Sequence, residues 1–112
     1  WLAVYGNPAT PDTAPDCQTA VRILSKRNAT TGLVSAGDPA FALAGQLLAA
    51  ELDYVAGAAQ YPAVTAANNE AVLLIGHYRF DGTTHQTIPR PQQNRVRQQA
   101  ELLDLYNNNA LP

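Results

Sequence analysis

The chain has 112 residues, seven lysines and arginines against nine aspartates and glutamates, and a formal net charge of −2. This length predicts one domain with a single core of modest size. The weak negative charge argues against a nucleic-acid partner held by electrostatic attraction, and no apolar run reaches the ~18 residues of a membrane span. Charged residues make up only 14% of the chain, beside many Ala, Thr, Asn, Gln and Pro residues, which favours a secreted or surface protein over a cytosolic enzyme.

The chain begins with an alternating apolar run of aromatic and branched residues, Trp1, Leu2, Ala3, Val4 and Tyr5, a pattern typical of a β-strand. No partner strand follows nearby. The run is therefore expected either to pack as an extended arm on the domain's own helices or to pair with a neighbouring domain or another copy. Prolines at positions 8, 11 and 15 predict an extended linker. We assign residues 1–15 to this arm and linker, and residues 16–112 to a helical domain.

A first helix is predicted from about Asp16 to Arg27. Its inward stripe is expected to contain Cys17, Ala20, Val21 and Leu24, with Ile23 at the margin. Lys26 and Arg27 are expected in the last turn, where positive charge complements the helix dipole. Cys17 is the single cysteine, so it is either a small buried apolar residue or the disulfide partner of a cysteine outside this segment.

Asn28, Ala29 and Thr30 form the one N-glycosylation sequon of the chain, directly after this helix and before a turn expected at Gly32. In an exposed loop, Asn28 would be a glycosylation site. A second interpretation requires no glycan, because asparagine tolerates the left-handed conformation that often ends a helix. Mass spectrometry of material from the native source would distinguish the two.

The most apolar stretch predicts a central helix that is capped by Asp38, begins at Pro39 and ends at Gly57. Its apolar residues are spread over most of the circumference: Phe41, Ala44, Leu48, Leu52 and Val55, widened by Leu43, Leu47 and Tyr54. Because a helix that is apolar on most sides must be covered on most sides, we expect it at the centre of the fold.

Two further helices complete the prediction. Pro62 favours the start of a third helix, which the turn at Asp81–Gly82 follows. Its inward face is expected to contain Val64, Ala67, Ala71, Leu74, Ile75 and Tyr78, widened by Leu73, with Asn68, Asn69 and Glu70 on the other side. A last helix from about Pro91 to Asn107 should bury Val96, Ala100 and Leu103, flanked by Leu102 and Tyr106, and solvate Gln92, Gln93, Arg95, Arg97, Gln98 and Gln99. The fold class is therefore all-α, a four-helix domain with an extended N-terminal arm.

Few residues are suited to metal binding. His77, Asp81 and His85 have a spacing that could hold a metal, but the turn at Asp81–Gly82 is expected to separate them. Asp104 and the asparagines at 107–109 carry oxygen ligands without the spacing of an EF-hand, and helix termination by asparagine accounts for them more simply. We predict no metal and no cofactor.

Catalytic patterns are equally scarce. Glu51 and Asp53 would lie about 200° apart around a helix and cannot flank one scissile bond. The sequence contains no G-x-S-x-G, P-loop or dinucleotide-binding motif. We therefore predict that the protein is not an enzyme.

Part of the chain resembles a group of Ala-rich helical modules found in secreted, multidomain bacterial surface proteins. The likeness rests on AVRILSKR, on SAGDPAFALAGQLLAAELDYVAGA, on a helix ending in FDG, and on LLDLYNNNAL. It covers roughly Cys17 to Leu111, and QLLAAELDYVAGA and LLDLYNNN are its most specific parts. The group is poorly characterised and has no established catalytic residues. The resemblance thus implies an extracellular or cell-surface location and a structural or interaction role.

The departures from that group concern cysteines. Its members often have one shortly before the third helix, where this chain has Tyr61–Pro62, and another after the asparagine run, beyond Pro112. The resemblance therefore implies that any disulfide of Cys17 joins it to a residue outside this stretch. The chain opens on Trp1 without a methionine, and we expect it to be a processed or excised segment.

Two functional classes follow. The first is a non-enzymatic extracellular structural module, a repeating subunit of a surface fibre that self-associates, or joins neighbouring domains, through Trp1–Tyr5. The second is a dockerin-like terminal module that binds a glycan or a protein. In that class Tyr61, Tyr78 and Phe80 would be the aromatic residues available for sugar stacking, unless they belong to the core.

Overall fold

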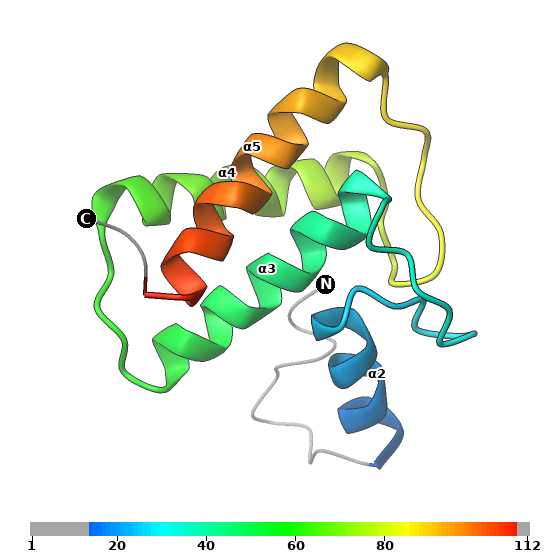
Figure 1. The fold of residues 1–112 in the computed structure, drawn as a ribbon, viewed down its shortest axis with the longest axis horizontal. Helices are drawn as coiled ribbons and strands as arrows, with labels where there is room; N and C mark the ends of the chain where they lie inside the picture. Colours follow the sequence, from blue (N-terminus) through cyan, green and yellow to red (C-terminus); the bar gives the residue numbers. More distant parts are fainter. Residues whose placement is uncertain (1–13, 110–112) are drawn as a thin grey trace.

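A computed structural model describes residues 14–109, which form four helices around one core (Figure 1). The helices are α2 (Ala14–Leu24), α3 (Pro39–Val55), α4 (Pro62–His77) and α5 (Arg90–Asn107). Residues 14–109 contain no strand, only an isolated bridge between Arg27 and Val34. The all-α, four-helix prediction is confirmed, and the arm Trp1–Tyr5 lies outside the described residues.

Helix α3 is the central element, in contact with α2, α4 and α5 (Figure 1). It begins as predicted, because Asp38 Oδ1 accepts a hydrogen bond from the Ala40 amide at 2.9 Å and Pro39 occupies the first turn. It ends at Val55, and Gly57 follows with a φ of +95°. Its buried residues are Ala40, Phe41, Leu43, Ala44, Gly45, Leu47, Leu48 and Ala50.

Two residues predicted to be inward on α3 are exposed. Leu52 is 47% exposed and Val55 86% exposed. Both lie on the same side of α3 as Gly45, where α2 crosses so closely that a Cβ on Gly45 would meet the Ile23 carbonyl oxygen. Helix α2 covers this side near the middle of α3 and leaves its last turn uncovered.

Helix α2 ends earlier than predicted and buries a different side chain. Its C-terminus has the hydrogen bonds of a Schellman motif, from the Lys26 amide to the Ile23 carbonyl (3.0 Å) and from the Arg27 amide to the Arg22 carbonyl (2.8 Å). Lys26 therefore has the left-handed φ of +56°, so neither it nor Arg27 lies in the last turn, which contains Arg22. Asn28 is not the left-handed residue.

Burial in α2 also differs from the prediction. Ile23, expected at the margin, is 1% exposed, whereas Val21, expected inside, is 61% exposed. The reason is that α2 packs mainly against α3, so that only one narrow side of it is well covered. The helix begins at Ala14, and the side chain of Cys17 lies outside the described residues.

The buried faces of α4 and α5 are largely confirmed, with three exceptions. Leu73 is 72% exposed because it lies about 180° around the helix from buried Val64. Asn68 lies only about 40° from Val64 and is 4% exposed, so it faces the core rather than the solvent side with Asn69 and Glu70. Gln99, one turn from Val96, is also buried, at 8% exposed.

None of the four described helices combines the length and the hydropathy that crossing a membrane requires.

Candidate functional site

Asn28 connects two loops that are far apart in the sequence. Its Oδ1 accepts hydrogen bonds from the Thr30 and Thr31 amides at 2.9 and 3.0 Å, and its Nδ2 donates to the Thr83 carbonyl at 3.1 Å. The adjacent Ala29 amide donates to the Gly82 carbonyl at 2.7 Å. Asn28 is half-buried, and the nitrogen that a glycan would modify faces the turn at residues 81–84. Glycosylation of Asn28 stays a prediction, and the side chain has a structural role of its own.

Replacing Asn28 with alanine is expected to lower the free energy of unfolding by about 1–3 kcal/mol, because three hydrogen bonds at the loop junction are lost. Urea denaturation measures this loss. Thr30→Ala is the matched control: it removes the same sequon but only one hydroxyl contact, to Thr83 Oγ1 at 2.7 Å, and should cost less. An equal loss in the two variants would contradict the structural role of Asn28.

His85 lies at the N-terminal end of α3. Its Nε2 is 2.7 Å from Asp38 Oδ2 and its Nδ1 is 2.6 Å from the Gln86 carbonyl oxygen. Its ring packs against Phe41 and Phe80, with centroids 6.2 and 6.4 Å away. Burial alone would lower the pKa of His85, but the hydrogen bonds to Asp38 and Gln86 and the nearby carboxylates outweigh it. The pKa is raised above the ordinary 6.5.

The residues weighed as a metal site are not brought together. His85 pairs with Asp38, whereas Asp81 Oδ1 accepts hydrogen bonds from the Thr83 and Thr84 amides at 2.8 and 2.7 Å. The Thr84 amide, followed by that of Thr83, lowers the pKa of Asp81. His77 is exposed at the end of α4. Within residues 14–109, no three His, Cys, Asp or Glu side chains form a group that could hold a metal ion.

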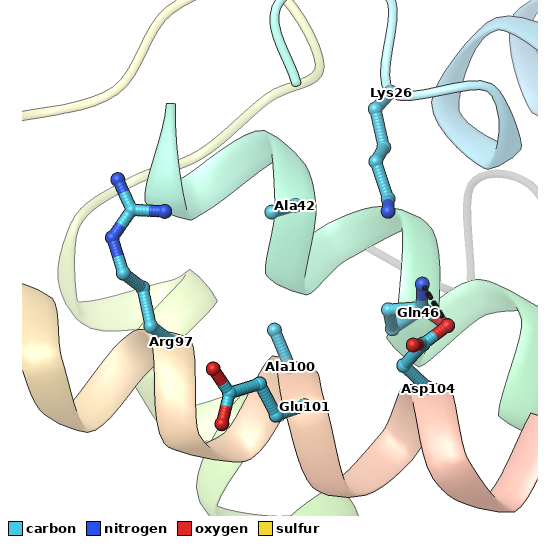
Figure 2. A pocket seen from close by; sticks show the side chains of 7 residues that line it. All are labelled: Lys26, Ala42, Gln46, Arg97, Ala100, Glu101 and Asp104. Carbon is cyan, nitrogen blue, oxygen red and sulfur yellow. Dashed lines mark hydrogen bonds between the residues drawn. The ribbon is translucent and has the colours of Figure 1, made fainter. Parts of the chain in front are cut away.

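A polar groove of about 170 Å³ lies between α3 and α5 (Figure 2). Figure 2 shows Lys26 reaching toward it from the loop after α2, with the remaining lining residues on the two helices: Ala42, Gln46, Arg97, Ala100, Glu101 and Asp104. Gln46 Nε2 donates to Asp104 Oδ1 at 3.1 Å, and Arg97 Nη2 donates to the Gly37 carbonyl at 3.1 Å. Two basic and two acidic side chains nearly cancel, so the groove has no net preference for an anion or a cation.

A second cleft, of about 380 Å³, lies at the end of the bundle. Figure 1 shows that α3 and α5 end and α4 begins on this side of the molecule. It is lined by Asp53, Ala58, Ala59, Tyr61, Tyr106, Asn107 and Asn109. Tyr106 Oη donates to the Ala59 carbonyl at 2.7 Å, and the rings of Tyr61 and Tyr106 are 6.2 Å apart and nearly perpendicular. These contacts fix an aromatic wall at the end of the bundle.

The asparagine run contributes to this cleft. Asn107 Nδ2 donates to the backbone and side-chain oxygens of Gln46 at 3.0 and 2.8 Å. Its Oδ1 is buried and has no hydrogen-bond partner in the described part of the chain. Asn109 has a φ of +55° beyond the last turn of α5, which confirms helix termination by asparagine.

Exposed apolar side chains also lie at this end of the bundle; of these, Tyr61 lines the second cleft, whereas Leu52, Val55 and Leu105 do not. Leu52 and Val55 lie in the last turns of α3, Leu105 is 46% exposed near the end of α5, and Tyr61 is 48% exposed just before α4. We call these four residues, together with the cleft, the bundle-end surface. Sequence reasoning named Tyr61 but missed the surface, because its members come from the ends of three separate helices.

Comparison of the chain with protein-family models, curated proteins and solved structures finds no match. The resemblance to secreted bacterial modules therefore stays a prediction from the residues quoted for it. Function has to be inferred from the surfaces of the molecule itself.

Proposed function

We propose that the chain is a non-enzymatic, extracellular structural module in which the segment Trp1–Tyr5 of one copy binds the bundle-end surface of the next. The observation that carries this proposal is the exposure of Val55, at 86%, beside Leu52 on the same side of α3. Neighbouring apolar side chains that no part of their own domain covers are typical of interaction sites.

The N-terminal segment has the chemistry that this surface would bind. Trp1 offers a large aromatic ring with one N–H donor, and Leu2, Val4 and Tyr5 add apolar area. The cleft offers the rings of Tyr61 and Tyr106. It also offers an acceptor in the Asp53 carboxylate. A largely apolar segment whose side-chain donors are the Trp1 N–H and the Tyr5 hydroxyl matches an aromatic cleft with a carboxylate on its wall.

The linker allows this contact to form between copies. Residues 6–13 include two prolines, and at ~3.1 Å per residue an extended, proline-rich segment of eight residues spans about 25 Å. That is more than twice the ~10 Å that separates packed helices. Binding of an arm to a different surface on the next copy is a head-to-tail contact, which produces open filaments when the rotation does not close. Repeated from copy to copy, such a contact would give the fibre subunit, whereas two arms exchanged reciprocally would give a closed dimer.

Negative-stain electron microscopy of the full chain and three variants tests the proposal. Trp1→Ala and Val55→Asp should each abolish filaments, because they remove the anchor and place a charge on its binding surface. Leu73→Asp is the matched control: Leu73 is also largely exposed, at 72% against 86% for Val55, but it lies on α4 outside the bundle-end surface, and filaments should persist. Filaments that survive both Trp1→Ala and Val55→Asp would overturn the proposed contact.

One observation favours the alternative, a carbohydrate-binding module. Tyr78 and Phe80 are buried, at 8% and 5% exposed, so of the three aromatic candidates only Tyr61 can stack on a sugar. It stands beside the hydrogen-bonding side chains of Asp53, Asn107 and Asn109. Glycan-array binding that Tyr61→Ala abolishes, and that Trp1→Ala leaves unchanged, would support this alternative.

A further inference from the structure

Both ring nitrogens of His85 face hydrogen-bond acceptors. Nε2 is 2.7 Å from a carboxylate oxygen of Asp38, and Nδ1 is 2.6 Å from the backbone oxygen of Gln86. A neutral imidazole has one N–H and can donate only one of these bonds, whereas an imidazolium donates both. In the neutral ring a nitrogen lone pair would face an oxygen at one of these short distances. The geometry therefore fits the protonated ring.

This one side chain connects several parts of the fold. Asp38 binds His85 through Oδ2 and caps α3 through Oδ1, at 2.9 Å from the Ala40 amide. The imidazole is 14% exposed and packs against Phe41 and Phe80, which also contact each other edge to face at 5.0 Å. His85 thus fastens the loop at residues 81–89 to the start of α3 and covers an aromatic pair.

We propose that His85 is a proton-operated latch: its protonated ring holds the middle of the 81–89 loop on α3, between the Asn28 contact at Thr83 and buried Ile88, and its deprotonation loosens this stretch and uncovers Phe41 and Phe80. This inference is independent of the proposed self-association, because it concerns the junction between this loop and the start of α3 rather than the bundle-end surface.

The charges around the ring support the protonated form. Asp38 faces it from the start of α3 and Asp81 from its own loop, and both favour the imidazolium. From α5, Arg97 donates to the carbonyl of Gly37, next to Asp38. Because the folded pKa of His85 is raised, the contribution of the latch to stability is complete below the ordinary 6.5 and is lost as the pH rises through the folded value.

Hydrogen exchange of the 81–88 amides, corrected for intrinsic exchange rates, tests the latch between about pH 6 and about pH 9. Wild-type protection should fall several-fold over this range. His85→Gln should remove this dependence and leave low protection throughout. The matched control is His77→Gln. His77 is the other histidine of the chain and is exposed, so this variant should behave as wild type. Protection that falls equally with pH in His85→Gln, or that does not change in wild type, would overturn the proposal.

A measurement on the unmodified side chain covers the case in which His85→Gln does not fold. The ¹⁵N shifts of the His85 ring should show both nitrogens protonated at about pH 6, with a titration midpoint above the ordinary histidine value. Asp38→Asn should lower that midpoint, because it removes the carboxylate that faces Nε2. A neutral ring at about pH 6, or a midpoint that Asp38→Asn does not change, would contradict the latch.

Discussion

Replacing Gly45 with alanine is expected to lower the free energy of unfolding by about 1–3 kcal/mol, although alanine is the better helix former. A Cβ at this position would lie 2.9 Å from the Ile23 carbonyl oxygen and 3.1 Å from Lys26 Cγ. The lysine chain can move aside, but the carbonyl belongs to the backbone of α2. Helix α2 must therefore shift away from α3, which loosens the burial of Ile23, at 1% exposed.

Gly76→Ala in α4 is the matched control for this prediction. It is the same change in another helix, but no atom lies within 4 Å of the new methyl group. Alanine should then stabilise the protein by roughly 0.5–1 kcal/mol through its helix propensity. Chemical denaturation of both variants should give effects of opposite sign. Two stabilised proteins would show that α2 and α3 do not approach as closely as described.

Leu47→Ala is expected to have the largest effect of all, a loss of about 2–5 kcal/mol. Leu47 is 0% exposed in the middle of α3, the helix that contacts all the others. Removing its side chain loses the transfer free energy of the buried atoms and leaves a cavity that the surrounding helices fill only in part. Urea denaturation at low protein concentration measures the free energy of unfolding of the variant and of wild type.

Leu52→Ala makes the same change five residues later in the same helix. Because Leu52 is 47% exposed, its loss should cost less than about 1 kcal/mol. The helical spacing of the sequence alone predicts that both leucines are buried, and therefore that the two variants lose similar amounts of stability. Equal losses in the two variants would therefore contradict the burial described for the last turn of α3.

The helices themselves could be predicted from local signals. Asp38 with Pro39, and Pro62, mark the starts of α3 and α4, and Gly57 marks the end of α3, because these residues have intrinsic preferences for those positions. The end of α2 could not be predicted in this way. Its left-handed residue is Lys26, a residue type with no preference for that conformation, and its carbonyl accepts a hydrogen bond from the Ser35 amide at 2.9 Å.

Burial was predicted less well than helix position, since it depends on where the neighbouring helices cross. Val21 and Val55 fit an apolar stripe, yet none of the four described helices covers them, whereas Asn68 is polar and faces the core. Neither amide atom of Asn68 has a hydrogen-bond partner among the described residues, an arrangement that a pattern of polar and apolar residues cannot indicate.

The candidate sites depend on contacts between distant residues. Asp38 and His85 are 47 positions apart, and Asn28 and Thr83 are 55 apart, so their pairing leaves no spacing signal in the sequence. Sequence reasoning grouped His85 with His77 and Asp81 because those residues are close along the chain. What it did identify, the Asn28 sequon and the apolar run Trp1–Tyr5, are local patterns.

The central claim, that the N-terminal segment binds the bundle-end surface of another copy, is tested most directly by tryptophan fluorescence. Trp1 is the single tryptophan of the chain, so the emission reports on this segment alone. We predict that the emission maximum of wild type moves to shorter wavelength as protein concentration rises, and that Val55→Asp removes this shift. An emission maximum that does not change with concentration, or that shifts equally in Val55→Asp, would contradict the claim.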